Sequence, residues 1–79
     1  MGTMSKTLHS NEYHLLVKWV KKCRLERNLS IRQLASLVGV SHSYIGKVEQ
    51  AERRLDIVEY IKYCEAMNVD PIKGIKLIQ

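Results

Sequence analysis

The feature that most constrains the fold of this chain is the spacing of small residues within residues 31–50. Ala35 and Gly39 stand four positions apart, and a serine precedes each of two short segments that carry apolar residues at helical spacing. Alanine permits two helices to cross almost in contact, and glycine adopts the positive φ that reverses the chain after a helix. The spacing therefore predicts two short helices joined by a tight turn.

Capping residues set the bounds of these two helices. Ser30 begins a capping box, with a glutamine three residues later, which predicts a helix over residues 31–38. Ser41 is the expected N-cap of the next helix, which runs to about Gln50 or Ala51. Apolar residues are expected to point inward from both helices: Leu34, Val38, Val40, Ile45 and Val48. An amphipathic hairpin within a bundle is the alternative, but the joint spacing favours a helix-turn-helix.

The segment before this motif is also expected to be helical. No stretch of the chain alternates with period two over the length of a strand. A helix over residues 11–27 has one apolar face, and Asn28 tolerates the left-handed conformation that ends a helix. That face consists of Tyr13, Leu16, Val17, Val20 and Cys23. Residues 1–10 lack apolar periodicity, so we expect a mobile arm followed by a single domain over residues 11–79.

Two further helices are expected after the polar residues 52–54. The fourth helix carries one apolar stripe, formed by Leu55, Val58, Ile61, Cys64 and Met67. Asp70 caps the fifth helix, and Pro71 occupies its first position, where a missing N–H has no consequence. Its apolar stripe is Ile72, Ile75 and Ile78. The chain is therefore expected to be all-α.

Size and charge narrow the function classes. The chain has 79 residues and a net charge of +5, so it is one small domain that cannot easily shelter a deep catalytic cleft beside its core. Residues 1–54 carry ten Lys and Arg against four Asp and Glu, whereas residues 55–79 carry three against four. The imbalance suggests a face for a polyanionic partner, but charge alone is explained equally well by a solvated basic surface. Because no signal peptide or run of about 20 apolar residues is present, we expect a cytoplasmic protein.

Catalytic and metal-binding classes find little support. Cys23 and Cys64 fall at apolar helical positions, which favours two reduced, buried thiols over a disulfide or a metal pair. The three histidines show no ligand spacing. The chain has no Gly-rich phosphate loop and no motif that places a nucleophile beside a histidine and a carboxylate. We therefore expect no enzyme activity, no metal and no cofactor.

Residues 16–78 resemble the helix-turn-helix family of the lambdoid phage repressors and Cro proteins, the Xre-like regulators. The matching residues are Arg24, Leu29-Ser30, Leu34-Ala35, Gly39-Val40-Ser41, Ile45, Glu49 and Ala66-Met67-Asn68-Val69. The resemblance implies a compact five-helix bundle that binds double-stranded DNA. It also implies an internal ion pair between Arg24 and Glu49, which is favoured over a direct phosphate contact by Arg24.

The resemblance further implies that the third helix enters the major groove with His42, Ser43, Gly46 and Lys47 as the residues that read bases. Lys47 suits guanine, whereas Ser43 and His42 donate or accept with less preference. For His42, an exposed residue of the capping turn without a specific contact is the alternative. A glycine inside a helix costs about 1 kcal/mol relative to alanine. Close approach to a base pair or close approach to another helix would explain Gly46 equally well.

Contacts with the DNA backbone are expected mainly from Arg53 and Arg54, with weaker contributions from Arg32, Gln33, Tyr44 and Gln50. In the family, a glutamine at the first position of the second helix clamps a phosphate, and here Ile31 stands there, so Arg32 or Gln33 is the expected substitute. Ala51 replaces the glycine that usually follows the third helix, which is expected to shift the helix end and the next loop.

These observations predict a sequence-specific transcriptional regulator, most simply a repressor, that acts as a homodimer. The fifth helix carries more apolar residues than one inward-facing stripe needs: Ile72, Ile75, Leu77 and Ile78. We therefore expect this helix to supply the dimer contact. The alternative is that all four complete the core. The competing function is a protein-interaction module, such as an antitoxin whose main ligand is a toxin or another regulator.

Overall fold

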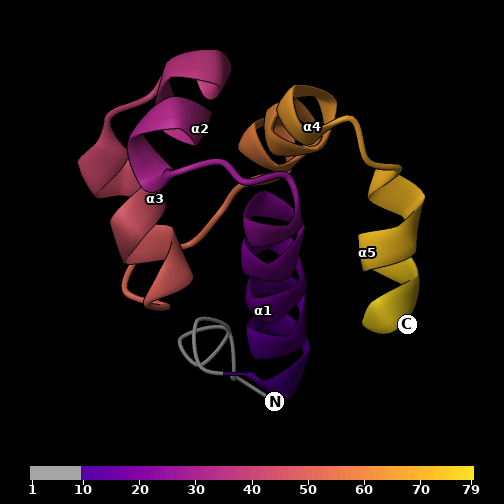
Figure 1. Ribbon diagram of the computed structural model, residues 1–79. Helices are drawn as coiled ribbons and strands as arrows, with labels where there is room; N and C mark the ends of the chain where they lie inside the picture. The colour runs from indigo at the N-terminus through magenta and orange to yellow at the C-terminus, as the bar shows by residue number, and fades with distance from the viewer. Residues whose placement is uncertain (1–9) are drawn as a thin grey trace.

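The computed structural model describes residues 10–79, and within that range it contains five α-helices and no strand. The helices are α1 (Asn11–Glu26), α2 (Ile31–Val38), α3 (His42–Glu49), α4 (Ile57–Met67) and α5 (Pro71–Leu77) (Figure 1). The predicted all-α, five-helix bundle is confirmed. The arm expected over residues 1–10 lies outside the described residues except for Ser10, which caps α1. None of the described helices has both the length and the apolar character that crossing a membrane requires.

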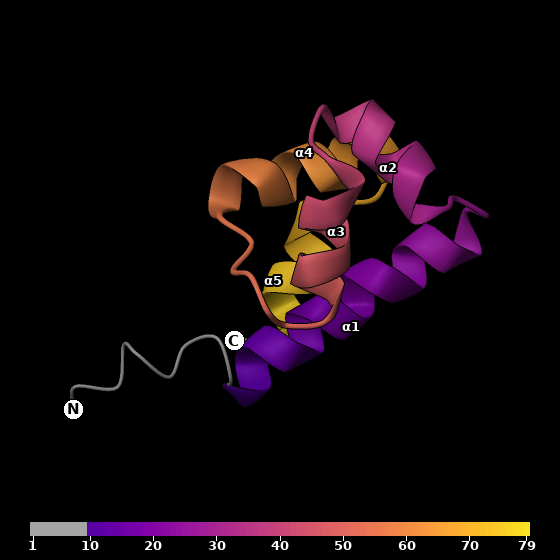
Figure 2. The same cartoon turned by 90° about the vertical axis from the view of Figure 1, so that its left-hand side faces the viewer.

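The first helix stands between the two ends of the bundle. In Figure 1, α2 and α3 lie on one side of α1, α5 lies on the other side, and α4 crosses at the top. Turned by 90°, α3 lies in front and α5 behind it (Figure 2). The helix-turn-helix and the C-terminal helix therefore occupy opposite sides of the molecule.

Side-chain caps and left-handed residues define where the helices begin and end. The Ser30 hydroxyl accepts from the Gln33 amide at 3.0 Å while the Gln33 side chain accepts from the Ser30 amide at 2.8 Å, so the predicted capping box is present. Ser41 accepts from the Tyr44 amide at the start of α3. Asn28 and Gly39 adopt φ of 57° and 88°, as their positions predict. Each predicted turn is thus built by local hydrogen bonds and by residues that tolerate the left-handed region.

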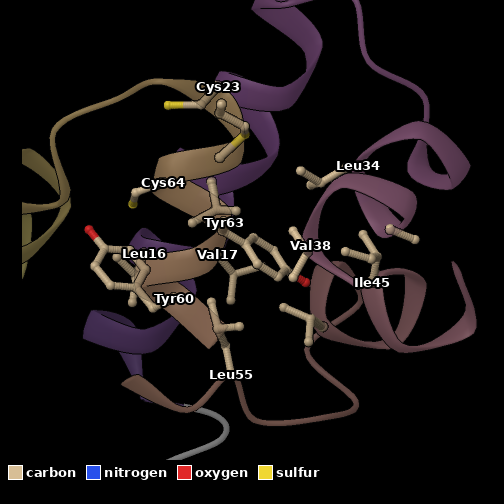
Figure 3. Close-up of a cluster of buried hydrophobic side chains, with 14 of the residues drawn as sticks. Leu16, Val17, Cys23, Leu34, Val38, Ile45, Leu55, Tyr60, Tyr63 and Cys64 are labelled. Atoms are coloured by element: carbon tan, nitrogen blue, oxygen red, sulfur yellow. The ribbon is translucent and has the colours of Figure 1, made fainter. Parts of the chain in front are cut away.

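The core joins α1 to the inward faces of α2, α3 and α4 (Figure 3), and Ile75 of α5 packs against it while partly buried. The predicted apolar face of α1 is buried throughout. Leu34 and Val38 of α2 are buried against Ile45 and Val48 of α3, and Val40 in the turn is partly buried. Cys23 and Cys64 are free and buried, in agreement with the expectation of two reduced thiols. Burial of this apolar surface is the main source of stability in a domain of this size.

The predicted apolar stripe of α4 is wrong at two positions. Val58 is 57% exposed and Ile61 is 37% exposed, whereas Tyr60 and Tyr63 are almost completely buried. Tyr60, Tyr63, Cys64 and Met67 form the inward face at spacings of three and four. Tyrosine rings bury a large apolar area, so two rings outweigh two smaller aliphatic side chains in selecting the face.

The two tyrosines of α4 point in opposite directions across the core (Figure 3). The Tyr60 hydroxyl donates to the Pro71 carbonyl at 2.5 Å, which ties α4 to the first turn of α5. The Tyr63 hydroxyl points toward the side of the core where Val38 and Ile45 lie, and it has no hydrogen-bond partner among the described residues. Burial raises the pKa of both phenols, so both stay protonated well above neutral pH.

Gly74 lets α5 lie against α1 and α4. A Cβ atom at this position would stand 2.2 Å from the Tyr60 hydroxyl oxygen and 2.8 Å from the Trp19 ring. Both distances are far below van der Waals contact, so only glycine fits here without rearrangement. The sequence gives no sign of this requirement, because the contact joins residues that are 55 and 14 positions apart.

Candidate nucleic-acid interface

Arg24 and Glu49 hold α3 against α1 from the buried side. Arg24 Nε and Nη2 donate to the two carboxylate oxygens of Glu49 at 2.6 and 2.9 Å, and the two side chains are 8% and 5% exposed. Arg24 Nη1 also donates to the Leu29 carbonyl at 2.8 Å. A two-pronged contact of this kind fixes orientation as well as distance. The pair therefore sets how α3 is presented to solvent, and Arg24 is not free to contact a phosphate.

The opposite, outward side of α3 lines a shallow hollow. The four residues expected to read bases all border it: His42, Ser43, Gly46 and Lys47. The remaining lining residues are Ile31, Arg32, Gln50 and Glu52. Within the described part of the chain, the side chains of His42, Ser43 and Lys47 make no hydrogen bond or ion pair. These polar groups are therefore available to an external ligand.

Gly46 leaves this surface open. A Cβ atom built at Gly46 would meet nothing within 4 Å, and the residue is partly exposed. Close approach to another helix, one of the two explanations expected from sequence, is therefore wrong. Packing among the described residues therefore does not account for the helix propensity that glycine loses at this position.

The loop after α3 turns back on the end of that helix. The amides of Glu52 and Arg53 both donate to the Lys47 carbonyl, at 2.8 and 3.2 Å. Ala51 adopts φ of 59°, a left-handed conformation that a β-carbon disfavours. The helix ends at Glu49 with Gln50 as its C-cap, slightly before the expected end at about Gln50 or Ala51, so Ala51 lies in the turn that follows the helix.

A buried tyrosine of α1 holds the next residues of that loop. The Tyr13 hydroxyl donates to the Arg53 carbonyl at 2.9 Å and accepts from the Leu55 amide at 2.8 Å. Burial raises the pKa of Tyr13, so its proton remains on the hydroxyl at neutral pH. From sequence, Tyr13 is only a core residue. Its role in fixing the arginine-bearing loop depends on contacts 40 and 42 residues away, which no local pattern indicates.

The expected backbone-contacting residues do not all lie together. The Arg53 guanidinium stacks over the Tyr44 ring at 4.7 Å from its centroid, beside a second hollow that Ser43 and Lys47 share. Arg32 and Gln50 border the first hollow. The Gln33 carbonyl oxygen is occupied by the capping box, which leaves its amide nitrogen for a ligand. Arg54 lines a different hollow, together with the carboxylates of Asp56 and Glu59.

Across the described residues no group of His, Cys, Asp and Glu is arranged to hold a metal ion. The two hollows beside α3 are shallow and lined mainly by hydrogen-bonding and cationic side chains, with one glycine, one isoleucine and one carboxylate, that of Glu52. Such a surface suits a polyanion with hydrogen-bonding edges better than a small substrate. The fold and this face together define a DNA-binding helix-turn-helix protein.

Comparisons with known proteins agree with this class. The Helix-turn-helix family model matches residues 20–73, and the chain belongs to that family, in its Xre-like branch. No relative was found among curated proteins. An XRE-family like protein from Pseudomonas syringae pv. tomato is 31% identical, with 96% of this chain and 94% of that chain covered and a TM-score of 0.82. The chain is therefore a DNA-binding transcriptional regulator.

Two other solved structures share the fold. The restriction-modification controller protein C.AhdI from Aeromonas hydrophila is 26% identical, with 82% of this chain and 98% of that chain covered and a TM-score of 0.76. The clp gene regulator ClgR from C. glutamicum is 16% identical, with 87% of this chain and 90% of that chain covered and a TM-score of 0.78. At 16% identity, the similarity to ClgR concerns the fold alone.

Proposed function

We propose that this chain recognises a specific double-stranded DNA sequence by placing α3 in the major groove, and that it acts as a transcriptional repressor in the cytoplasm. The observation that carries the proposal is the convergence of His42, Ser43 and Lys47 around the open space at Gly46. Side chains that have no hydrogen-bond or ion-pair partner among the described residues, on a helix fixed from its buried side, suit the reading of base edges.

Each residue is given a role that its chemistry supports. Lys47 donates to guanine, Ser43 and His42 contact neighbouring base edges, and Gly46 admits a base pair or a thymine methyl group. The backbone contacts fall to the flanking residues: Arg32, Gln33, Tyr44, Gln50, Arg53 and Arg54. Because Arg53 is preorganised on the Tyr44 ring, it is the strongest of these candidates.

We further propose that the protein binds as a homodimer, because one recognition helix covers few base pairs and half-sites usually lie about 34 Å apart. On α5, Ile72 is 53% exposed and Leu77 is 47% exposed, while Ile75 and Ile78 are partly buried. The alternative in which all four complete the core is therefore wrong. Loss of the dimer in Ile72→Glu, measured by analytical ultracentrifugation, would support contact through α5. A dimer unaffected by this change would instead direct attention to α4, where Ile57 is 62% exposed.

The DNA-binding proposal is tested by fluorescence anisotropy with random-sequence duplex DNA at several salt concentrations. We expect affinity to fall steeply with salt and the slope to flatten in Arg53→Ala/Arg54→Ala. The matched control is Lys73→Ala/Lys76→Ala, which removes two cations from α5 on the far side and should leave the slope near that of the wild type.

A second arm tests base reading. After selection of a consensus from a randomised duplex library, Lys47→Ala should relax the preference at one base pair, with a loss of about tenfold in discrimination. No binding to any duplex at low salt would contradict the proposal. In that case the exposed apolar residues of α4 and α5 would favour the competing function, a module for binding a toxin or another regulator.

A further inference from the structure

Glu52 is a carboxylate on the DNA-facing side of the molecule to which the proposed function gives no role. It follows α3 closely, and its amide donates to the Lys47 carbonyl at 2.8 Å. Its exposed side chain borders the same hollow as His42, Gly46 and Lys47. The two ion pairs found among the described residues, Lys22–Glu26 and Arg24–Glu49, do not include it. Its carboxylate therefore has no ion-pair partner among residues 10–79.

A carboxylate at this place is unfavourable in two ways. It stands near the C-terminal end of α3, where the helix dipole is negative and favours cations. It also faces the surface that phosphates would approach, where it opposes the attraction exerted by Lys47 and Arg32. Such a group favours one DNA sequence over others where that sequence offers it a hydrogen-bond donor that offsets these two unfavourable contributions.

The major groove offers such a contact. The N4 amino group of cytosine donates into the groove, and a carboxylate is the side-chain group that best accepts from it. A phosphate has only acceptors and negative charge, so a sequence without a suitably placed amino group leaves the carboxylate repelled and unpaired.

We propose that Glu52 is a specificity-determining residue, whose carboxylate accepts a hydrogen bond from a cytosine N4 amino group in the preferred site and disfavours other sequences. This inference rests on the proposed function and assigns one base pair of its target. It differs from the role of Lys47, because Glu52 raises discrimination mainly by weakening the wrong complexes.

The test uses the full chain, a randomised duplex library and two substitutions at Glu52. Glu52→Ala should bind random-sequence duplex about fivefold more tightly at low salt, the equivalent of one like-charge contact in water. The gain should shrink as salt is raised. Its selected consensus should lose one cytosine preference, with a fall of about tenfold in the ratio of consensus to random binding. Glu52→Gln should instead change that preference toward adenine, since an amide pairs with adenine N6 and N7.

Glu65→Gln is the matched control, because it removes one exposed carboxylate from α4 and changes the net charge equally. It should keep the wild-type consensus and a similar ratio of consensus to random binding. If Glu52→Ala and Glu52→Gln select the same consensus as the wild type, the inference is overturned while DNA recognition through α3 stands. If the wild type binds no duplex at low salt, the proposed function fails and the inference fails with it. Circular dichroism spectra of all variants confirm that the comparison is between folded proteins.

Discussion

Gly46 and Gly74 both lie inside helices, yet they stand on opposite sides of the bundle and have opposite surroundings. Around Gly46 on α3 a Cβ atom would meet nothing within 4 Å. At Gly74 on α5 it would stand 2.2 Å from a tyrosine hydroxyl and 2.8 Å from an indole ring. Each glycine costs its helix about 1 kcal/mol relative to alanine. At Gly74 close packing against Tyr60 and Trp19 offsets this cost. At Gly46 no contact with the described residues offsets it.

The difference separates a side that holds the bundle together from a side that is kept open. On the side of α5, the glycine closes the gap to Trp19 and Tyr60. On the side of α3, buried groups of α1 fix the helix and its following loop from behind, while the side chains of His42, Ser43 and Lys47 make no hydrogen bond or ion pair with the described residues. The substitutions below test whether the two sides respond in opposite directions.

The largest effect is expected from Gly74→Ala. The added methyl group would overlap the Tyr60 hydroxyl and the Trp19 ring, and overpacking of this kind costs about 3 kcal/mol in the free energy of unfolding. Urea denaturation followed by circular dichroism measures the loss. In the Tyr60→Phe background the hydroxyl is absent, so the additional cost of Gly74→Ala should be smaller. An equal cost in both backgrounds would show that the hydroxyl is not the obstacle.

Tyr13→Phe should destabilise the protein by about 2 kcal/mol. It removes the hydroxyl between the Arg53 carbonyl and the Leu55 amide and leaves that buried amide without a partner. Tyr63→Phe is the matched control, because its buried hydroxyl has no hydrogen-bond partner in the described part of the chain and its removal should leave stability equal or higher. Similar losses in both variants, measured by urea denaturation, would contradict the role of Tyr13 in fixing the loop.

Gly46→Ala should act in opposite directions on stability and on DNA binding. Alanine fits the open space at Gly46 and favours the helix, so the free energy of unfolding should rise by about 1 kcal/mol. The same methyl group occupies the space proposed for a base pair, so affinity for the selected consensus should fall by about tenfold. Thermal denaturation and anisotropy on the same preparation give both values. Unchanged affinity would sink the assignment of this space to DNA.

The smallest effect is expected from Ala51→Gly. The left-handed conformation at Ala51 costs about 1–2 kcal/mol for a residue with a β-carbon, and the greater freedom of glycine in the unfolded chain offsets part of the gain. We expect a net stabilisation of about 0.5 kcal/mol. Ala66→Gly, within α4, provides the contrast, since glycine there should destabilise by about 1 kcal/mol. A loss of stability in Ala51→Gly would contradict the strain argument.

Features that depend on neighbouring residues were the ones that the sequence could predict. The caps at Ser30 and Ser41 and the left-handed residues Asn28 and Gly39 each act within one turn of chain, where spacing carries the information. The α4 face was predicted wrongly because Val58 and Ile61 looked more apolar than Tyr60 and Tyr63, and only the packed core shows that the rings fit inside.

Features that depend on distant contacts could not be predicted. Nothing near Gly74 in sequence indicates that Trp19 presses against it, and nothing near Tyr13 indicates that its hydroxyl bridges two residues of a loop. The sequence could not distinguish the two explanations of Gly46, close approach to a base pair and close approach to another helix. They differ only in what surrounds the residue in space. Glu52 does not stand out in the sequence, because the role proposed for it depends on the cations and polar groups that share its hollow.

The buried pair of Arg24 and Glu49 also makes the outward face of α3 easy to re-engineer. This pair fixes α3 from its inner side, and the side chains of the outward residues His42, Ser43 and Lys47 make no hydrogen bond within residues 10–79. Their identities can therefore be changed in combination without disturbing the scaffold, and a library randomised at these positions should yield mostly folded proteins. Changes in target sequence can then accumulate in this domain without a compensating change in its core.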